Sequence, residues 1–142
     1  MKPCHCLLVD DHPLVRRGVR DLLIHEQLCS VIEEASSGEE AVQAVRRQPW
    51  DLMLLDVALP DKHGLEVFKE TKQLQPHLPV LMLSLYPEKE FALRALRAGA
   101  AGYLTKQSAP AELLTAVTRV LQGGRYITEA LADQMAEALG TG

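Results

Sequence analysis

The 142-residue sequence contains no uninterrupted apolar run of membrane-spanning length and no leader-like N-terminus. It also lacks an excess of basic residues, since 15 Lys and Arg residues are outnumbered by 19 Asp and Glu residues. A broad positive surface that holds nucleic acid through its phosphates is therefore not expected. There is no repeat at a solenoid period and no low-complexity tract. These absences favour a cytoplasmic protein that does not contact a membrane.

Cysteine is scarce as well. The three residues Cys4, Cys6 and Cys29 form an odd set without a zinc-binding spacing, which suits a reducing compartment. A metal site built from Cys4-His5-Cys6 and Cys29 is one interpretation. On an N-terminal strand, however, Cys4 and Cys6 would point to the same face as small apolar side chains, and we favour that interpretation.

The residues that are present suit one ordinary globular domain, since 47% are hydrophobic and 24% are charged. Apolar runs alternate about five times with stretches of helical period, which predicts a doubly wound α/β fold with right-handed crossovers. Alternation alone does not give the strand order. The expected strands are residues 4–9, 31–32, 51–55, 80–83 and 101–105, and the expected helices are residues 14–23, 39–47, 65–74, 88–98 and 110–123.

The segment after Gly123-Gly124 does not follow this alternation. Apolar residues recur every four positions there, which predicts a short amphipathic helix whose apolar side needs a surface on this domain or on a partner. We therefore expect one domain over residues 1–124 and a linker with this helix over residues 125–142. The four apolar positions are Ile127, Leu131, Met135 and Leu139.

Four of the expected strands end in residues that phosphoryl-transfer chemistry needs. The first runs into Asp10-Asp11, the third into Asp56, the fourth into Ser84 and the fifth into Lys106. The carboxyl ends of parallel strands meet at one edge of the sheet, where ligands bind in open α/β folds. The sequence thus predicts a crevice that contains three carboxylates, a hydroxyl and an ammonium.

The three acidic residues Asp10, Asp11 and Asp56 require a compensating cation if they lie together. Two carboxylates about 4 Å apart repel by about 1 kcal/mol in water and about 4 kcal/mol in a partly buried site. Carboxylate oxygens, waters and a phosphate are ligands that suit Mg²⁺. An alternative for Asp11 is capping of the first helix, but that leaves Asp56 on another strand unexplained.

Lys106 is the candidate cation for Asp56. A purely structural ion pair is the alternative, but buried pairs are often no more stable than apolar substitutes and need another reason to exist. Ser84 by itself could start a turn, and Tyr103 by itself could be a half-buried core residue. His12 and His63 flank this edge without a metal-binding spacing and are interpreted as incidental.

Taken together, these motifs resemble those of a response-regulator receiver domain over residues 6–123. The resemblance rests on residues 7–13, on Leu54-Leu55-Asp56 with Pro60 and Gly64, on Ser84, and on residues 102–106. Residues 10–16 and 93–104 are most similar to the NarL/FixJ type, which usually carries a C-terminal helix-turn-helix domain for DNA.

The resemblance implies a flavodoxin-like, doubly wound five-stranded parallel sheet of order 2-1-3-4-5 with helices on both faces. It implies that Asp56 is the phosphoacceptor for a sensor histidine kinase, with Mg²⁺ as cofactor. The implied metal ligands are Asp11, Asp56 and the backbone carbonyl of Ala58, with Asp10 acting through water. Lys106 would pair with the phosphoryl oxygens, and Ser84 and Tyr103 would form the switch.

The resemblance further implies a signalling domain rather than an enzyme, one that controls transcription through a DNA-binding domain absent from this chain. It favours a homodimer through residues 14–23 and 111–121. Two positions depart from the family pattern. Gln107 stands where many receivers have proline, so a cis peptide after Lys106 is not assumed, and the loop at 60–64 is more charged than usual.

Three other functions fit the residues less well. An aspartyl-phosphate phosphohydrolase of the haloacid-dehalogenase type needs an acid two residues after the nucleophile, where this chain has Ala58. A flavin-binding protein of similar topology needs a phosphate loop after the first strand, but residues 10–13 are acidic there. A receiver-like module without phosphorylation would not need Asp11, Asp56, Ser84 and Lys106 together.

Overall fold

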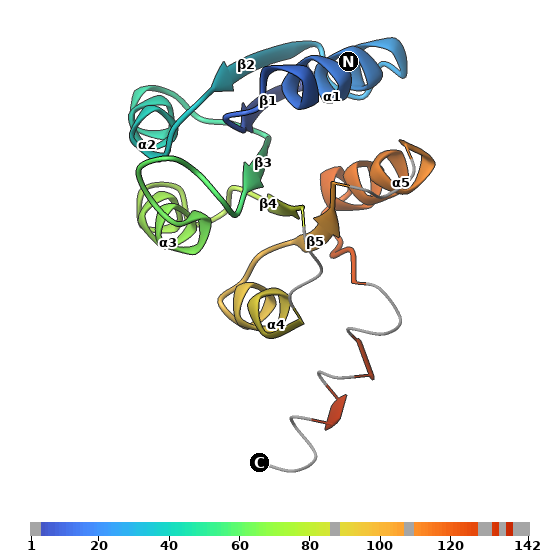
Figure 1. Cartoon of the computed structure of the whole chain (residues 1–142). Helices are drawn as coiled ribbons and strands as arrows, with labels where there is room; N and C mark the ends of the chain where they lie inside the picture. The colour runs from blue at the N-terminus through green and yellow to red at the C-terminus, as the bar shows by residue number, and fades with distance from the viewer. Residues whose placement is uncertain (1–3, 86–88, 107–109, 128–131, 134–135, 138–142) are drawn as a thin grey trace.

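The computed structural model describes residues 4–85, 89–106, 110–127, 132–133 and 136–137, and it contains five strands and five helices in strict alternation (Figure 1). All strand pairs are parallel, in the order β2-β1-β3-β4-β5. This confirms the expected sheet. The elements are β1 His5–Val9, α1 Pro13–His25, β2 Val31–Ala35, α2 Gly38–Arg47, β3 Leu52–Asp56, α3 Gly64–Leu74, β4 Val80–Ser84, α4 Lys89–Arg97, β5 Gly102–Thr105 and α5 Pro110–Leu121.

Successive strand residues point to opposite faces of the sheet, and both faces are buried. In β1, Leu7 and Val9 belong to one apolar cluster, which α2, α3 and α4 cover. Cys6 and Leu8 belong to the other, which α1 and α5 cover. Figure 1 shows these two helix layers on either side of the sheet. Burial on both faces explains why the central strands are continuously apolar.

The segment that follows α5 lies along the outer edge of β5. Tyr126 forms a parallel bridge with Gly102, and its N–H donates to the Ala101 carbonyl at 2.7 Å. A Cβ at Gly102 would lie 2.7 Å from the carbonyl oxygen of Tyr126, so glycine permits this close approach. The Arg125 guanidinium donates to the carbonyls of Leu96 and Ala100 at 2.6 and 3.1 Å. The start of the expected linker is therefore fixed to the domain.

The amphipathic helix expected over residues 125–142 lies mostly outside the described residues, which omit Leu131, Met135 and Leu139. Residues 132–133 and 136–137 have helical backbone, and Ile127 packs against the cluster that α2, α3 and α4 cover. The peptide after Lys106 also lies outside the described part. Among the described helices, none is both long and apolar enough to cross a membrane.

Candidate functional site

The candidate site lies at the carboxyl ends of β1, β3 and β5. In the parallel register Val9 pairs with Leu55, so Asp10 and Asp56 continue from neighbouring strands at the same edge of the sheet. Both side chains are buried, with 0% of Asp10 and 1% of Asp56 exposed. Parallel strands that end at the same edge of the sheet thus bring together residues that are 46 positions apart in the sequence, as the sequence pattern predicts.

Lys106 neutralises part of this buried charge. Its Nζ lies 2.8 Å from Asp10 Oδ2 and 2.8 Å from Asp56 Oδ2, and only 3% of its side chain is exposed. The expected ion pair with Asp56 is confirmed, and Asp10 shares the same ammonium. Two buried carboxylates therefore depend on one cation.

His12 lies closer to the site than the sequence suggests. Its Nδ1 is 2.9 Å from Asp10 Oδ1, 3.1 Å from Asp11 Oδ1, 3.9 Å from Asp56 Oδ2 and 3.3 Å from Lys106 Nζ. Its interpretation as incidental missed these contacts, because a single histidine carries no metal-binding spacing. The signal that was present is its position directly after the Asp10-Asp11 pair. His63 has a different role, since its Nδ1 accepts from Leu65 N at 3.2 Å and caps α3.

Burial raises the pKa of Asp56 above its ordinary value, even though the hydrogen bond from Lys106 opposes this effect. The neighbouring charge of Asp10 raises the pKa of Asp56 further. Because the carboxylates of Asp10, Asp11 and Asp56 lie around one Lys106 ammonium, the site contains more negative charge than Lys106 offsets. Ligand atoms of Asp10, Asp11, His12 and Asp56 all lie within 4.8 Å of one another, so the acidic cluster could bind a metal ion.

The loop between β3 and α3 is held tightly against Asp56. Ala58 N donates to Asp56 Oδ1 at 3.1 Å, and Gly64 N donates to the Val57 carbonyl at 2.7 Å. A Cβ at Gly64 would lie 2.5 Å from the Asp56 carbonyl oxygen and 2.6 Å from the Val57 Cα, which leaves room only for glycine. The backbone of Ala58 is thus positioned next to the carboxylate, where the resemblance implies a ligand.

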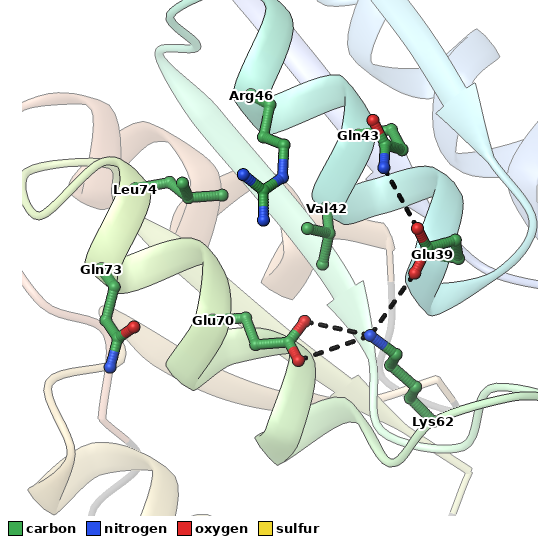
Figure 2. A pocket seen from close by; sticks show the side chains of 8 residues that line it. All are labelled: Glu39, Val42, Gln43, Arg46, Lys62, Glu70, Gln73 and Leu74. Carbon is green, nitrogen blue, oxygen red and sulfur yellow. Dashed lines mark hydrogen bonds and ion pairs between the residues drawn. The ribbon is translucent and has the colours of Figure 1, made fainter.

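The charged side chains of this loop contact the neighbouring helices α2 and α3. Asp61 caps α2 by accepting from Gly38 N at 2.7 Å and Glu39 N at 2.9 Å, and these hydrogen bonds lower the pKa of Asp61. The Lys62 ammonium lies 3.5 Å from Glu39 and 3.1 Å from Glu70, across a groove between α2 and α3 (Figure 2). Sequence reasoning missed the Asp61 cap, because it joins residues more than 20 positions apart.

Ser84 and Tyr103 lie on the adjacent strands β4 and β5. Ser84 ends β4 and is 7% exposed, and its carbonyl accepts from Lys106 N at 2.6 Å. Tyr103 in β5 is 4% exposed and packs in the cluster covered by α2, α3 and α4. The expected switch pair is therefore connected through the backbone to the strand end that carries Lys106.

Comparison with known proteins supports this picture. A family model described as a response regulator receiver domain matches residues 6–118. Response regulator UvrY of Escherichia coli is 40% identical over 130 residues, which cover 92% of this chain and 60% of that protein. Transcriptional activator protein ExaE of Pseudomonas putida is 44% identical over 92% of this chain and 61% of its own length. The chain thus spans about three fifths of these curated relatives.

Solved structures show the same fold. A LuxR-family two-component response regulator from Aurantimonas matches with a TM-score of 0.86 and 35% identity, over 96% of this chain and 98% of that one. A CheY-like response regulator receiver domain protein from Methanospirillum hungatei matches with a TM-score of 0.80 and 26% identity, over 86% of this chain and 96% of that one.

Proposed function

This chain belongs to the response-regulator receiver family, and from this premise we propose that Asp56 accepts a phosphoryl group from a sensor histidine kinase in the cytoplasm. The observation that carries the proposal is a buried carboxylate at a strand end that shares one ammonium with a second buried carboxylate. Burial of these carboxylates lowers the stability of the folded state, and a purely structural role does not explain why the chain retains them. A nucleophile beside a phosphoryl-binding cation does explain it.

Mg²⁺ is the cofactor that fits this donor set. The site offers hard carboxylate oxygens, and the three carboxylates of Asp10, Asp11 and Asp56 gather around the single ammonium of Lys106. We propose Asp11, Asp56 and the Ala58 carbonyl as ligands, with Asp10 acting through water. When bound, the ion would supply positive charge to the oxygens of the transferred phosphoryl group.

The residues of the chain perform the transfer. An oxygen of Asp56 forms a bond to phosphorus as the bond between phosphorus and the kinase histidine nitrogen breaks. The product is an acyl phosphate, and the imidazole, which carries a proton on its other nitrogen, leaves as a neutral histidine. Lys106 moves its ammonium from the carboxylate toward the new phosphoryl oxygens. Ser84 then hydrogen-bonds the phosphoryl group, and Tyr103 changes rotamer with it. We propose no phosphohydrolase activity, since Ala58 stands where an aspartyl-phosphate phosphohydrolase needs a second acid.

Treatment with acetyl phosphate and Mg²⁺ tests this function. The intact chain should gain the mass of one phosphoryl group, and hydroxylamine should remove it because acyl phosphates are labile to that nucleophile. Chelation of the metal with EDTA before treatment should prevent the gain. A modification that survives hydroxylamine, or forms equally without metal, would contradict the proposal.

Magnesium affinity tests the ligand assignment separately. Asp11→Asn should weaken Mg²⁺ binding by about tenfold or more, because the variant loses a charged ligand while the Asp56–Lys106 ion pair is retained. Isothermal titration calorimetry is the suitable measurement, since Trp50 precedes β3 and lies at the opposite end of that strand from Asp56. Asp21→Asn, at an exposed position of α1, is the matched control. Equal affinity in Asp11→Asn and wild type would remove Asp11 from the ligand set.

We propose a weak homodimer through α1 and α5, strengthened by phosphorylation. These helices lie on the same side of the sheet (Figure 1), and α1 presents Leu14 and Ile24 with 83% and 45% of their surfaces exposed. Sedimentation with beryllofluoride should show a larger mass than without it, and Leu14→Glu should abolish the shift. Leu74→Glu, on α3 at the opposite face, should retain it. A monomer in both conditions would contradict the dimer.

The output of the whole protein is part of the same proposal. Residues 1–124 form the receiver, residues 125–142 form the linker, and transcription is controlled through a C-terminal helix-turn-helix domain outside this chain. The name of ExaE as a transcriptional activator and the LuxR-family structural neighbour support this assignment. DNA would be contacted only by that further domain, since this chain has a net charge of −4.

A further inference from the structure

The three cysteines gather at the end of the sheet opposite the acidic site. Cys4 immediately precedes β1 and is half-buried, Cys6 lies within β1, and Cys29 lies just before β2. The Cys4 thiol donates a hydrogen bond to Cys29, with 3.4 Å between the two Sγ atoms. Cys6 and Cys29 belong to the same buried apolar cluster. Cys4 and Cys29 are therefore more than separate apolar side chains, because their thiols contact each other.

Backbone hydrogen bonds keep Cys4 and Cys29 close to each other. The N–H groups of Ser30 and Val31 both donate to the Cys4 carbonyl at 3.1 Å, so the residue after Cys29 is tied directly to Cys4. The two sulfurs come from the segments that precede two neighbouring strands, β1 and β2, and their residues are 25 positions apart in the sequence. Neither thiol belongs to a disulfide. The pair is thus preorganised by the β1–β2 ladder.

A metal site is the less suitable function for this cluster. Within the part of the chain that the structure describes, the acidic site is the one group of three or more acidic, histidine or cysteine side chains placed to hold a metal ion. The three described cysteines do not form a second such group. A bond between two of them requires only one short contact, and the closest described contact joins Cys4 and Cys29.

We propose that Cys4 and Cys29 are a modification site that forms an intramolecular disulfide when the protein meets a hydroperoxide. The peroxide oxidises the Cys4 thiol to a sulfenic acid, and its other oxygen leaves as an alcohol or as water. The Cys29 sulfur then attacks the Cys4 sulfur, the S–S bond forms, and the sulfenic hydroxyl leaves with the Cys29 proton as water. Two thiols are oxidised and one peroxide is reduced.

Exposure decides which thiol reacts first. Cys4 is half-buried and accessible, whereas Cys29 is 2% exposed and Cys6 is 0% exposed. Burial and the hydrogen bond to Cys29 raise the pKa of Cys4 to about 12, and the Asp51 carboxylate contributes in the same direction. Since the thiolate is the nucleophile, oxidation is slow near neutral pH and faster in alkaline solution. The product is uncharged, which suits its apolar surroundings.

The bridge would stabilise the part of the chain that it encloses. It closes a loop that contains all of α1, Pro13–His25, and so restricts the unfolded chain. A loop of this size should raise the midpoint of thermal unfolding by roughly 5 to 10 °C. The acidic site lies at the other end of β1, so phosphorylation of Asp56 should proceed equally in reduced and oxidised protein. The proposal is therefore independent of the phosphoacceptor role.

The experiment treats the reduced, full chain with hydrogen peroxide at pH 8.5 and maps cysteine linkages by mass spectrometry without reduction. Monomeric protein should lose the mass of two hydrogen atoms, yield a Cys4–Cys29 crosslinked peptide and return to its starting mass with dithiothreitol. Cys6→Ser should retain the crosslink, and Cys4→Ser should lose both the crosslink and the rise in thermal midpoint. Serine at position 4 should disturb folding less than serine at the buried Cys29, because Cys4 is only half-buried. Circular dichroism should confirm that the Cys4→Ser variant is folded.

Three results would overturn the proposal. The first is retention of three free thiols after peroxide treatment of folded wild type. The second is a crosslink that joins Cys29 to Cys6 rather than to Cys4. The third is a product that consists of disulfide-linked dimers.

Discussion

Replacement of Asp56 by asparagine should abolish phosphorylation and also make the folded chain more stable. The first effect follows from the loss of the carboxylate that we propose as the nucleophile. The second follows from the removal of one of two buried carboxylates that share the Lys106 ammonium. Asparagine can still accept the Ala58 N–H through its side-chain oxygen. The thermal midpoint should rise by roughly 2 to 4 °C, as expected for about 1 kcal/mol in a chain of this size.

Mass spectrometry after incubation with acetyl phosphate and Mg²⁺ measures the first effect, and thermal unfolding followed by circular dichroism measures the second. Asp61→Asn is a matched control in the same loop, because its remaining side-chain oxygen can still cap α2 and it does not contact Lys106. This control should be phosphorylated like wild type. Undiminished phosphorylation of Asp56→Asn would move the nucleophile to another residue.

The stability of wild type should depend on pH through the same carboxylate. Folding raises the pKa of Asp56 above its ordinary value of 3.8, chiefly through burial, so the folded state binds a proton that the unfolded state has already released. The contribution of Asp56 to stability therefore falls as pH rises from 3.8 through the raised pKa. Denaturant titrations of wild type and Asp56→Asn across this range should diverge as pH rises, with the variant becoming relatively more stable.

The sequence predicts the central part of this fold well, because its physical signal is local. The run at β3 is buried on both faces, so a continuous apolar stretch marks it without any knowledge of its neighbours. At the sheet edge the signal is weaker. The expected second strand covered only residues 31–32, whereas β2 extends to Ala35 through Glu33 and Glu34, which pair with Leu7 and Leu8 by backbone hydrogen bonds. Strand residues with exposed polar side chains, paired only through the backbone, leave no apolar pattern from which the strand could be predicted.

In the candidate site, too, some residues could be predicted from local sequence and others could not. Asp56 and Lys106 could be predicted, because each ends an apolar run and parallel strands bring such ends together. The strand order came from resemblance to a family, since alternation alone permits several orders. The contacts of His12 could not be predicted, because they depend on Asp10, Asp11 and Lys106 surrounding it in three dimensions.

Lys106→Met should have the opposite effect on stability to Asp56→Asn. Methionine keeps much of the length of the lysine side chain but removes the only ammonium described within 4 Å of both Asp10 and Asp56. Breaking a buried pair by removal of one partner typically costs about 3 to 5 kcal/mol, because the remaining charge is buried without compensation. Phosphorylation should also fall steeply, since the variant lacks the cation that we propose pairs with the phosphoryl oxygens.

A double-mutant cycle with urea unfolding separates this explanation from a simple packing defect. If uncompensated charge causes the loss, Lys106→Met combined with Asp56→Asn should recover part of the stability, so that the two changes are strongly non-additive. The deficit of Lys106→Met should also shrink in mildly acidic solution, where Asp56 can bind a proton. Lys69→Met, at an exposed position of α3, is the control and should be nearly neutral. Additive effects at all pH values would show that Lys106 stabilises the fold by packing, and its role as counter-ion to Asp56 would have to be abandoned.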